Sequence, residues 1–370
     1  MAINIPDYIK SIKPYTPGKP IEELEREMGI SGSIKLASNE NPLGASPKAV
    51  AAMQAALNSL NRYPDGSGYY LTQKLAAKMG VQPETVVLGN GSDDVIGMLA
   101  RALLQVGEEA VMTAPSFLMY EILVKSVGAK PVFVPLNNLA VDLHAMLAAV
   151  TDKTRIVFIN NPNNPTGTYI RQDEFETFLK KLPSSVTVVL DEAYIEFART
   201  PDCLDGLSVV GENPPVAVLR TFSKIYGLAG IRIGYGVMPV ALAEILHRVR
   251  QPFNTSSLAQ AGAIAALDDD EFLNKTLQLV STELEFLQTA LSKMQISSFP
   301  TQANFFLIDV KQDAGRVFQA MLKEGVIIRS MVSYGYPQYI RVNVGTRAEN
   351  IRFLNVFEKV MDETAKEAGQ

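Results

Sequence analysis

The stretch Arg220-Thr221-Phe222-Ser223-Lys224, followed by a glycine-rich loop that ends at Arg232, decides how this chain of 370 residues is interpreted. One lysine stands among small hydroxyl residues, and an arginine follows it eight positions later. A deprotonated lysine amine is a nucleophile that forms a Schiff base with an aldehyde. The hydroxyl groups and the arginine are donors that suit a phosphate. An aldehyde that carries a phosphate is pyridoxal 5'-phosphate, so the stretch predicts this cofactor.

The region around this stretch alternates short β-branched runs with amphipathic segments. We expect strands at 85–89, 110–113, 131–134, 155–160, 186–190, 216–220 and 233–237, and helices at 93–104, 117–126, 142–149 and 172–182. This alternation predicts a mostly parallel α/β sheet of seven strands, flanked by helices on both faces. In such sheets ligands bind at the carboxyl ends of the strands, and the polar motifs of this chain follow predicted strands.

The rest of the chain predicts a second, smaller domain. Residues 255–296 read as one long helix, and they precede strands at 304–310, 326–329 and 339–343 and a helix at 314–324. Residues 1–44 are rich in proline, with a helix near 22–28. We therefore expect an N-terminal arm over 1–44 that joins the small domain, a large domain over 45–275 and a small α+β domain over 276–370.

Composition argues against several classes of function. The formal charge of −5, from 34 basic and 39 acidic residues without long runs, argues against a surface for nucleic acid or anionic membranes. No apolar run approaches the roughly 20 residues of a membrane helix, and the N-terminus does not resemble a signal peptide. The single cysteine cannot form an intramolecular disulfide, and the only two histidines, His144 and His247, lie far apart. We expect a cytoplasmic protein without a metal, nucleic-acid or membrane partner.

Polar residues at two predicted strand ends are candidates for binding the cofactor ring. Asp191 ends a buried strand, where a carboxylate is costly unless it is paired. It is either a helix N-cap or the partner of a pyridine nitrogen, whose cationic form it would stabilise. Tyr194 follows three residues later, within reach of the phenolic oxygen of the ring. Asn164, in the loop 161–167, either forms part of a turn or donates its amide to a ligand oxygen.

Two other strand ends carry weaker signals. Gly91, Ser92 and Asp93 link a strand to a helix, and Ser92 or Asp93 is expected to cap that helix. The N–H groups at such a helix start form a phosphate site. Phe117 follows another strand end, where it either stacks on a planar ring or belongs to the core.

Together these residues form an ordered set that resembles the fold-type-I pyridoxal-phosphate aminotransferases along nearly the whole chain. The resemblance implies that Lys224 holds the cofactor as an internal aldimine and serves as the general base. It implies that Asp191 pairs with the pyridine nitrogen, and that Asn164 and Tyr194 contact the phenolic oxygen. It also implies a set of phosphate-binding groups, namely Thr221, Ser223, Arg232 and the backbone of Gly91, Ser92 and Asp93.

Three stretches, at 14–26, 37–44 and 62–65, are similar to the histidinol-phosphate branch of this family. That likeness implies transamination between histidinol phosphate and 2-oxoglutarate or glutamate, with imidazole acetol phosphate as the keto product, in histidine biosynthesis. An aromatic amino-acid aminotransferase shares nearly every motif, and so do decarboxylases of phosphorylated amino acids. A non-catalytic module that kept the fold is the alternative from another class, and the intact set of Lys224, Asp191 and Arg341 argues against it.

The same likeness implies that Arg341, Arg329, Tyr15 and Asn164 bind the substrate and that Tyr63 belongs to the cofactor set. Arg341 would pair with the substrate α-carboxylate, since its planar fork suits that group. Arg329 would bind either the substrate phosphate or the side-chain carboxylate of glutamate. Tyr15 would help to close the pocket, and Tyr63 would reach across a homodimer interface to the phosphate of the partner's cofactor.

Overall fold

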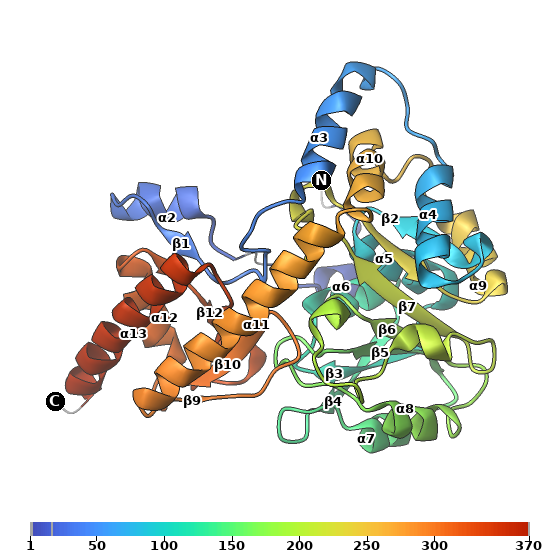
Figure 1. Ribbon diagram of the computed structural model, residues 1–370. Coiled ribbons are helices and arrows are strands. Elements are labelled where there is room, and N and C mark those ends of the chain that lie inside the picture. Colours follow the sequence, from blue (N-terminus) through green and yellow to red (C-terminus); the bar gives the residue numbers. More distant parts are fainter. Residues whose placement is uncertain (1–2, 16–17, 369–370) are drawn as a thin grey trace.

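The computed structural model of the protein describes residues 3–15 and 18–368 (Figure 1). Its centre is a seven-stranded sheet in the order β2-β8-β7-β6-β5-β3-β4. Only β8 runs antiparallel to its neighbours, so the expectation of a mostly parallel sheet is confirmed. The strands are β2 (Val86–Gly89), β3 (Glu109–Ala114), β4 (Lys130–Pro135), β5 (Thr154–Asn160), β6 (Thr187–Asp191), β7 (Val216–Thr221) and β8 (Gly234–Val237).

Both faces of this sheet are covered by helices because successive side chains of each strand point to opposite faces. In β6, Val189 packs into a core with α5 (Ser92–Leu103), α6 (Leu118–Ser126) and α9 (Val240–Val249). Its neighbours Val188 and Leu190 instead join the core beneath α7 (Leu143–Ala148) and α8 (Gln172–Leu179). A strand buried on both faces reads as a continuous apolar run, as this one does.

A second sheet lies among the C-terminal helices. It has the order β12-β13-β10-β9, all antiparallel, and it is accompanied by long helices that pack on it and on one another. The N-terminal segment lies beside these helices in Figure 1, because β1 pairs in parallel with β11. The elements are α1 (Asp7–Lys10), α2 (Ile21–Met28), β1 (Ile34–Lys35), α11 (Asp270–Lys293), β9 (Ser297–Ser298), β10 (Phe305–Asp309), α12 (Ala314–Lys323), β11 (Val326–Ile327), β12 (Arg329–Ser330), β13 (Tyr339–Asn343) and α13 (Arg347–Ala368).

Two expectations about individual elements were wrong. The predicted helix at 255–296 is divided into α10 (Ser257–Ala266) and α11, because Asp269 caps the second helix by accepting from the Phe272 N–H. The same carboxylate accepts a bond of 2.6 Å from the hydroxyl of Ser46, which precedes α3 (Pro47–Ala56). The predicted strand at 326–329 is likewise divided between two sheets, as β11 and β12.

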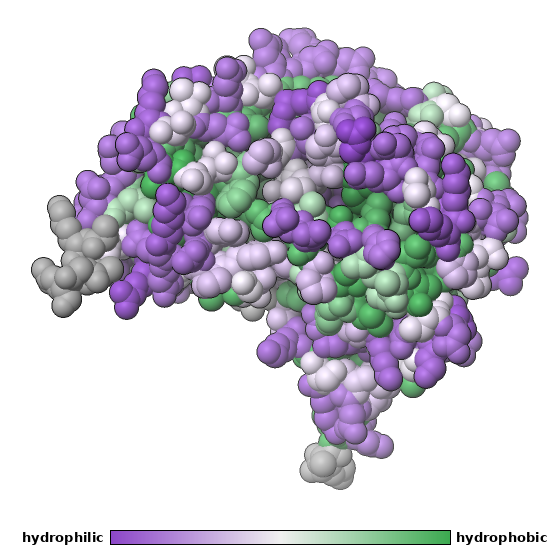
Figure 2. All heavy atoms as spheres, turned by 90° about the horizontal axis from the view of Figure 1, so that it is seen from below, coloured by the Kyte–Doolittle hydropathy of each residue, from purple (hydrophilic) through white to green (hydrophobic). Residues whose placement is uncertain are grey.

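Helices α3 and α4 (Tyr69–Met79) pack with α10 at one end of the molecule, away from the C-terminal helices (Figure 1). Viewed from below, most of the surface is hydrophilic, and an apolar area lies on the side of the molecule that contains the seven-stranded sheet (Figure 2). Among the residues described, no helix combines the length and the apolar character that a membrane crossing requires.

Candidate active site

A cavity of about 200 Å³ opens at the carboxyl ends of the central strands. Residues after β2, β3, β5, β6 and β7 line it, as the parallel topology requires. The structure brings ten of the residues expected to bind the cofactor together here, namely Ser92, Asp93, Phe117, Asn164, Asp191, Tyr194, Thr221, Ser223, Lys224 and Arg232. Ser38 and Glu40, from the N-terminal segment, also line the cavity.

Asp191 is held at the buried end of β6 with one carboxylate oxygen bonded and the other free. The Tyr120 hydroxyl donates a hydrogen bond of 2.6 Å to Asp191 Oδ2, whereas Oδ1 has no partner among the described residues. Burial raises the pKa of Asp191 to about 6. The N-cap interpretation is wrong, because the short helix that follows starts at Ile195. A free, buried carboxylate oxygen in a cavity suits a protonated ring nitrogen.

Lys224 reaches into the same cavity from the loop after β7. Its Nζ donates to the Ser38 carbonyl at 3.1 Å and lies 5.7 Å from the centre of the Tyr194 ring. Burial, with the nearby Arg341 guanidinium, lowers the pKa of Lys224 to about 8. A larger fraction of this amine is therefore unprotonated near neutral pH than in an exposed lysine, which favours attack on an aldehyde.

The hydroxyl and guanidinium donors that line the cavity suit an anion. The Thr221 hydroxyl lies 3.0 Å from that of Ser223, and Arg232, in the left-handed region with φ 57°, brings its guanidinium 3.4 Å from Asp93. Gly91 has φ 82°, and a Cβ there would lie 2.5 Å from Arg232 Nη2. The positive φ therefore favours glycine at this position.

The expected cap of α5 by Ser92 or Asp93 is wrong. The helix starts at Ser92 after Gly91, and no side chain of the described residues caps it. Its first N–H groups consequently keep the capacity to bind a phosphate.

Tyr194 joins the cofactor cavity to the residues expected to bind substrate. Its hydroxyl accepts hydrogen bonds from Asn39 Nδ2 at 3.0 Å and from Asn164 Nδ2 at 3.4 Å. The buried Arg341 donates to Asn164 Oδ1 and, at 2.9 Å, to the Ala37 carbonyl. Its Nε is buried and has no hydrogen-bond partner within the described part of the chain.

Of the residues expected to bind substrate, only Asn164 lines this cavity, and Arg341, Arg329 and Tyr15 do not. Arg329 stands opposite Arg341 in the β12–β13 ladder, so both side chains leave the same face of the sheet. Arg329 lines a neighbouring cavity of about 330 Å³ that also includes Phe117. Tyr15 and Tyr63 line neither cavity and are 46% and 82% exposed. The Tyr63 ring stacks on Phe253, with centroids 4.7 Å apart.

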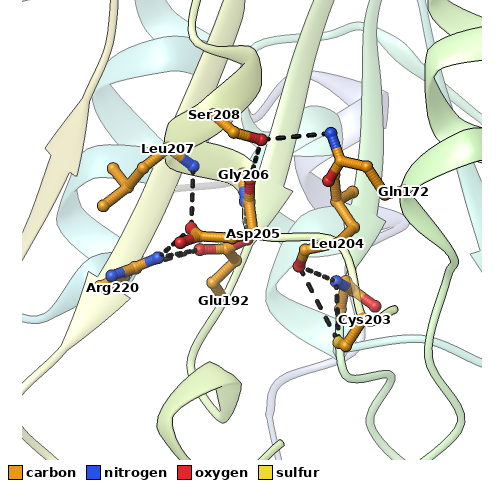
Figure 3. A network of polar contacts seen from close by, with 10 residues as sticks. Gln172, Glu192, Cys203, Leu204, Asp205, Gly206, Leu207, Ser208 and Arg220 are labelled. Atoms are coloured by element: carbon orange, nitrogen blue, oxygen red, sulfur yellow. Dashed lines mark hydrogen bonds and ion pairs between the residues drawn. The ribbon is translucent and has the colours of Figure 1, made fainter. Parts of the chain in front are cut away.

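A buried ion pair fixes the strand ends behind the site (Figure 3). Glu192 follows Asp191, Arg220 precedes Thr221, and Arg220 Nε and Nη2 donate to Glu192 Oε2 at 3.0 and 2.8 Å. The backbone N–H of Gly206 donates to the other oxygen of Glu192. Burial raises the pKa of Glu192 to about 7, although Arg220 acts in the opposite direction. The pair ties the end of β6 to the end of β7.

Sequence reasoning missed Tyr120 and Asn39. Tyr120 lies in a helix as an ordinary apolar-face residue, and it contacts Asp191 from 71 positions away. Asn39 is part of the stretch 37–44, which was identified by its likeness to the histidinol-phosphate branch but without a role for this side chain. Neither residue follows a strand of the central sheet, which was the signal that identified the others.

The residues present fit pyridoxal phosphate. The free Asp191 oxygen matches its ring nitrogen, the Lys224 amine matches its aldehyde, and the donors near Arg232 match its phosphate. Phe117 lines the cavity between these groups, with its ring edge-on to that of Tyr120.

Comparisons with known proteins agree with this geometry. A family model described as aminotransferase class I and II matches residues 31–357. A histidinol-phosphate aminotransferase from Desulfotalea psychrophila is 48% identical over 366 residues, which cover 98% of this chain and 97% of the relative. The histidinol-phosphate aminotransferase 2 of Pseudomonas aeruginosa is 47% identical over 355 residues, with 95% and 96% covered.

The solved structures give the same result. The crystal structure of histidinol-phosphate aminotransferase from Sinorhizobium meliloti in complex with pyridoxal-5'-phosphate has a TM-score of 0.90 at 27% identity. The match covers 98% of this chain and 99% of that one. The family match and the full-length relatives together lead to one conclusion: the chain belongs to the class I and II aminotransferases.

Proposed function

We propose that this protein is a pyridoxal-phosphate-dependent aminotransferase that transfers an amino group between histidinol phosphate and 2-oxoglutarate, with glutamate as the other amino acid, in histidine biosynthesis. The observation that carries the chemistry is the single cavity that holds the unpaired Asp191 Oδ1 together with the Lys224 amine. The substrate is supported by relatives 47–48% identical over nearly the full chain, which carry the name histidinol-phosphate aminotransferase.

Lys224 has two tasks in this proposal. Bound pyridoxal phosphate supplies an aldehyde for the amino group and a ring that withdraws electrons from the substrate Cα. Lys224 Nζ anchors the cofactor, and once a substrate amine has displaced it, the same nitrogen takes the proton from Cα. Asp191 Oδ1 accepts the hydrogen bond of the ring nitrogen and keeps that nitrogen protonated.

The remaining cavity residues hold the ring and the phosphate. Asn164 and Tyr194 contact the phenolic oxygen, and Phe117 stacks on the ring. The phosphate is bound by the hydroxyls of Thr221 and Ser223 and by the guanidinium of Arg232. It is also bound by the backbone at the N-terminus of α5, at Gly91, Ser92 and Asp93.

Arg341 and Arg329 are the groups for the substrate anions. A guanidinium pairs with a carboxylate or a phosphate through the same fork, which allows one pocket to accept glutamate and histidinol phosphate in turn. The free Nε of Arg341 supports this role, and so does the position of Arg329 on the same sheet face. Tyr15 closes over the substrate.

The test uses purified protein loaded with pyridoxal phosphate. Glutamate alone should remove the visible absorbance of the bound cofactor, because the first half-reaction needs no second substrate. Lys224→Ala should abolish turnover and leave some cofactor binding, and wild-type-like turnover would contradict the assignment. kcat/KM should be higher for histidinol phosphate than for phenylalanine; the reverse order would identify an aromatic amino-acid aminotransferase instead.

A homodimer, with Tyr63 reaching the partner's cofactor phosphate, is part of the same proposal. Tyr63 stacks on the exposed Phe253, and the chain on either side of Tyr63 carries further exposed apolar side chains, namely Leu57, Leu60, Tyr69 and Tyr70, between 50% and 74% exposed. An apolar surface of this kind is typical of a protein–protein interface. The division into an arm over 1–44, a large domain over 45–275 and a small domain over 276–370, and a cytoplasmic location, also belong to the proposal.

A further inference from the structure

Residues 37–39 run through the active site and meet side chains from both sheets. Each of the three carbonyls in this segment accepts a hydrogen bond from a different side chain. Ala37 O accepts from Arg341 Nη2 at 2.9 Å, and Ser38 O accepts from Lys224 Nζ at 3.1 Å. The third, Asn39 O, accepts at 3.1 Å from the Nδ2 of Asn304, which directly precedes β10.

Asn39 has the densest contacts in this segment. Its N–H donates to Asn343 Oδ1 at 3.2 Å, and its side chain donates to the Tyr194 hydroxyl at 3.0 Å. The residue is 1% exposed, and its φ of 54° lies in the left-handed region. That conformation is uncommon for a side chain other than glycine, although asparagine tolerates it better than most. The bonds made by its N–H, its carbonyl and its Nδ2 hold it there, whereas its buried Oδ1 has no partner among the described residues.

The Tyr194 hydroxyl has a fixed hydrogen-bonding capacity of one donor and two acceptor positions. The amides of Asn39 and Asn164 fill both acceptor positions. The proton of the hydroxyl is therefore directed to a third partner. Tyr194 lines the cofactor cavity, so an oxygen of a bound cofactor would be that partner.

We propose that Asn39 is a positioning residue that forces the Tyr194 hydroxyl to act as a hydrogen-bond donor toward the cofactor ring. The inference rests on the proposed function and adds a residue to it. The link to the second sheet follows from the same contacts. Asn343 and Arg341 are two positions apart in β13, so their side chains leave the same face. Asn39 thus ties the donor hydroxyl to the strand that carries Arg341.

The substitution that isolates this role is Asn39→Gly. Glycine adopts the left-handed conformation without strain and keeps the backbone bonds to Asn304 and Asn343. Only the amide that faces Tyr194 is lost. A donor to an oxygen anion stabilises that anion, so a weaker Tyr194 bond raises the pKa of the cofactor group that titrates with it. The pH midpoint of the cofactor's visible absorbance should rise by about one unit.

A double-mutant cycle separates this role from a structural one. Tyr194→Phe alone should raise the midpoint, and Asn39→Gly in the Tyr194→Phe background should raise it no further, because Asn39 acts through the hydroxyl. An unchanged midpoint in Asn39→Gly, or a shift that adds fully to that of Tyr194→Phe, would overturn the proposal.

Asn39→Asp gives a second test if the glycine variant folds poorly. A carboxylate accepts only, so the bond reverses and Tyr194 donates away from the cavity. The pH midpoint of the cofactor absorbance should rise more in Asn39→Asp than in Asn39→Gly. A shift in Asn39→Asp that is equal to or smaller than that in Asn39→Gly would contradict the inference. Asn343→Asp is the matched control, since it adds the same charge to the same network but keeps the acceptor that Asn39 N–H uses. The pH midpoint should shift less in Asn343→Asp than in Asn39→Asp.

Two further measurements distinguish a failure of this inference from a failure of the proposed function. Unfolding of each apoprotein by denaturant reports whether the variants fold. Wild-type protein that binds no cofactor, or shows no turnover, would contradict the proposed function, whereas an altered function with an intact Asn39 effect would leave this inference in place.

Discussion

The Tyr120 hydroxyl and the Asp191 carboxylate form a buried hydrogen bond of 2.6 Å. Tyr120 is fully buried, with its ring stacked on Phe158 and edge-on to Phe117. The bond occupies Asp191 Oδ2 and leaves Oδ1 without a partner in the described chain. One tyrosine thus touches both the carboxylate and the aromatic ring proposed to hold the cofactor.

Tyr120→Phe should reduce kcat about tenfold, which corresponds to about 1.4 kcal/mol. The Tyr120 bond lowers the pKa of Asp191, which burial has raised to about 6. Without the bond that pKa rises further, and less of the carboxylate is ionised at neutral pH to support the ring nitrogen. Steady-state kinetics of the loaded enzyme measure the change.

Tyr169→Phe is the control for this prediction. The Tyr169 hydroxyl also donates to a carboxylate, that of Asp202 at 3.2 Å, but it lies outside the cavity. Its kcat should match the wild type. If both variants behave alike, the Tyr120 bond does not tune Asp191.

The attack of Lys224 on the cofactor aldehyde should follow the unprotonated fraction of its amine. Burial and the neighbouring Arg341 lower the pKa of Lys224 to about 8. The rate at which the apoprotein incorporates pyridoxal phosphate should therefore rise with pH and level off above about 8, since only the neutral amine attacks. Stopped-flow absorbance gives this profile. A rate that continues to rise up to the pH at which an ordinary lysine loses its proton would show that the pKa of Lys224 is not lowered.

Glu192→Ala should lower the free energy of unfolding by about 3–5 kcal/mol, because the largely buried Arg220 guanidinium loses its fully buried partner and keeps only the exposed carboxylate of Asp205. Denaturant unfolding above neutral pH, where Glu192 is ionised in the pair, measures the loss. Glu192→Gln keeps an acceptor and should cost less.

Asp205→Ala supplies a matched comparison. Asp205 bonds the same Arg220 Nη2 at 2.7 Å, but its side chain is 61% exposed (Figure 3). A solvent-exposed pair contributes about 0–1 kcal/mol, so this variant should be close to the wild type. Equal losses in Glu192→Ala and Asp205→Ala would mean that burial does not decide the strength of the network.

Mixing two inactive variants tests whether Tyr63 acts on the partner subunit. If it does, Tyr63→Ala and Lys224→Ala impair different residues of a shared site, and a mixed dimer regains one site with both residues intact. Activity should appear when the two proteins are unfolded and refolded together, but not when each is refolded alone. Failure to recover activity in dimers shown to be mixed would place Tyr63 outside the partner's site. A mass measurement of the native protein tests the dimer itself.

Residues that follow predicted strands were found from the sequence alone, because a parallel sheet places all carboxyl ends of its strands at one edge. Asp191, Lys224 and Asn164 meet in one cavity for this reason, although up to 60 residues separate them. The break between α10 and α11 was not predicted, although Asp269, which caps α11 by accepting from the Phe272 N–H, is a local signal; its second bond, to Ser46, comes from 223 positions away. Arg329 and Arg341 were both identified, but only strand pairing places them opposite each other.

The sheet, its class and the residues at the strand ends could be predicted from the amino-acid sequence, since alternating apolar runs and polar loop residues are local patterns. The hydrogen-bond partners of those residues follow only from the tertiary structure. Tyr120 leaves one Asp191 oxygen free, and Asn39 meets Asn343 from 304 positions away and orients Tyr194. Hydrogen bonds of this kind depend on the directions of side chains brought together by packing, which no local pattern records.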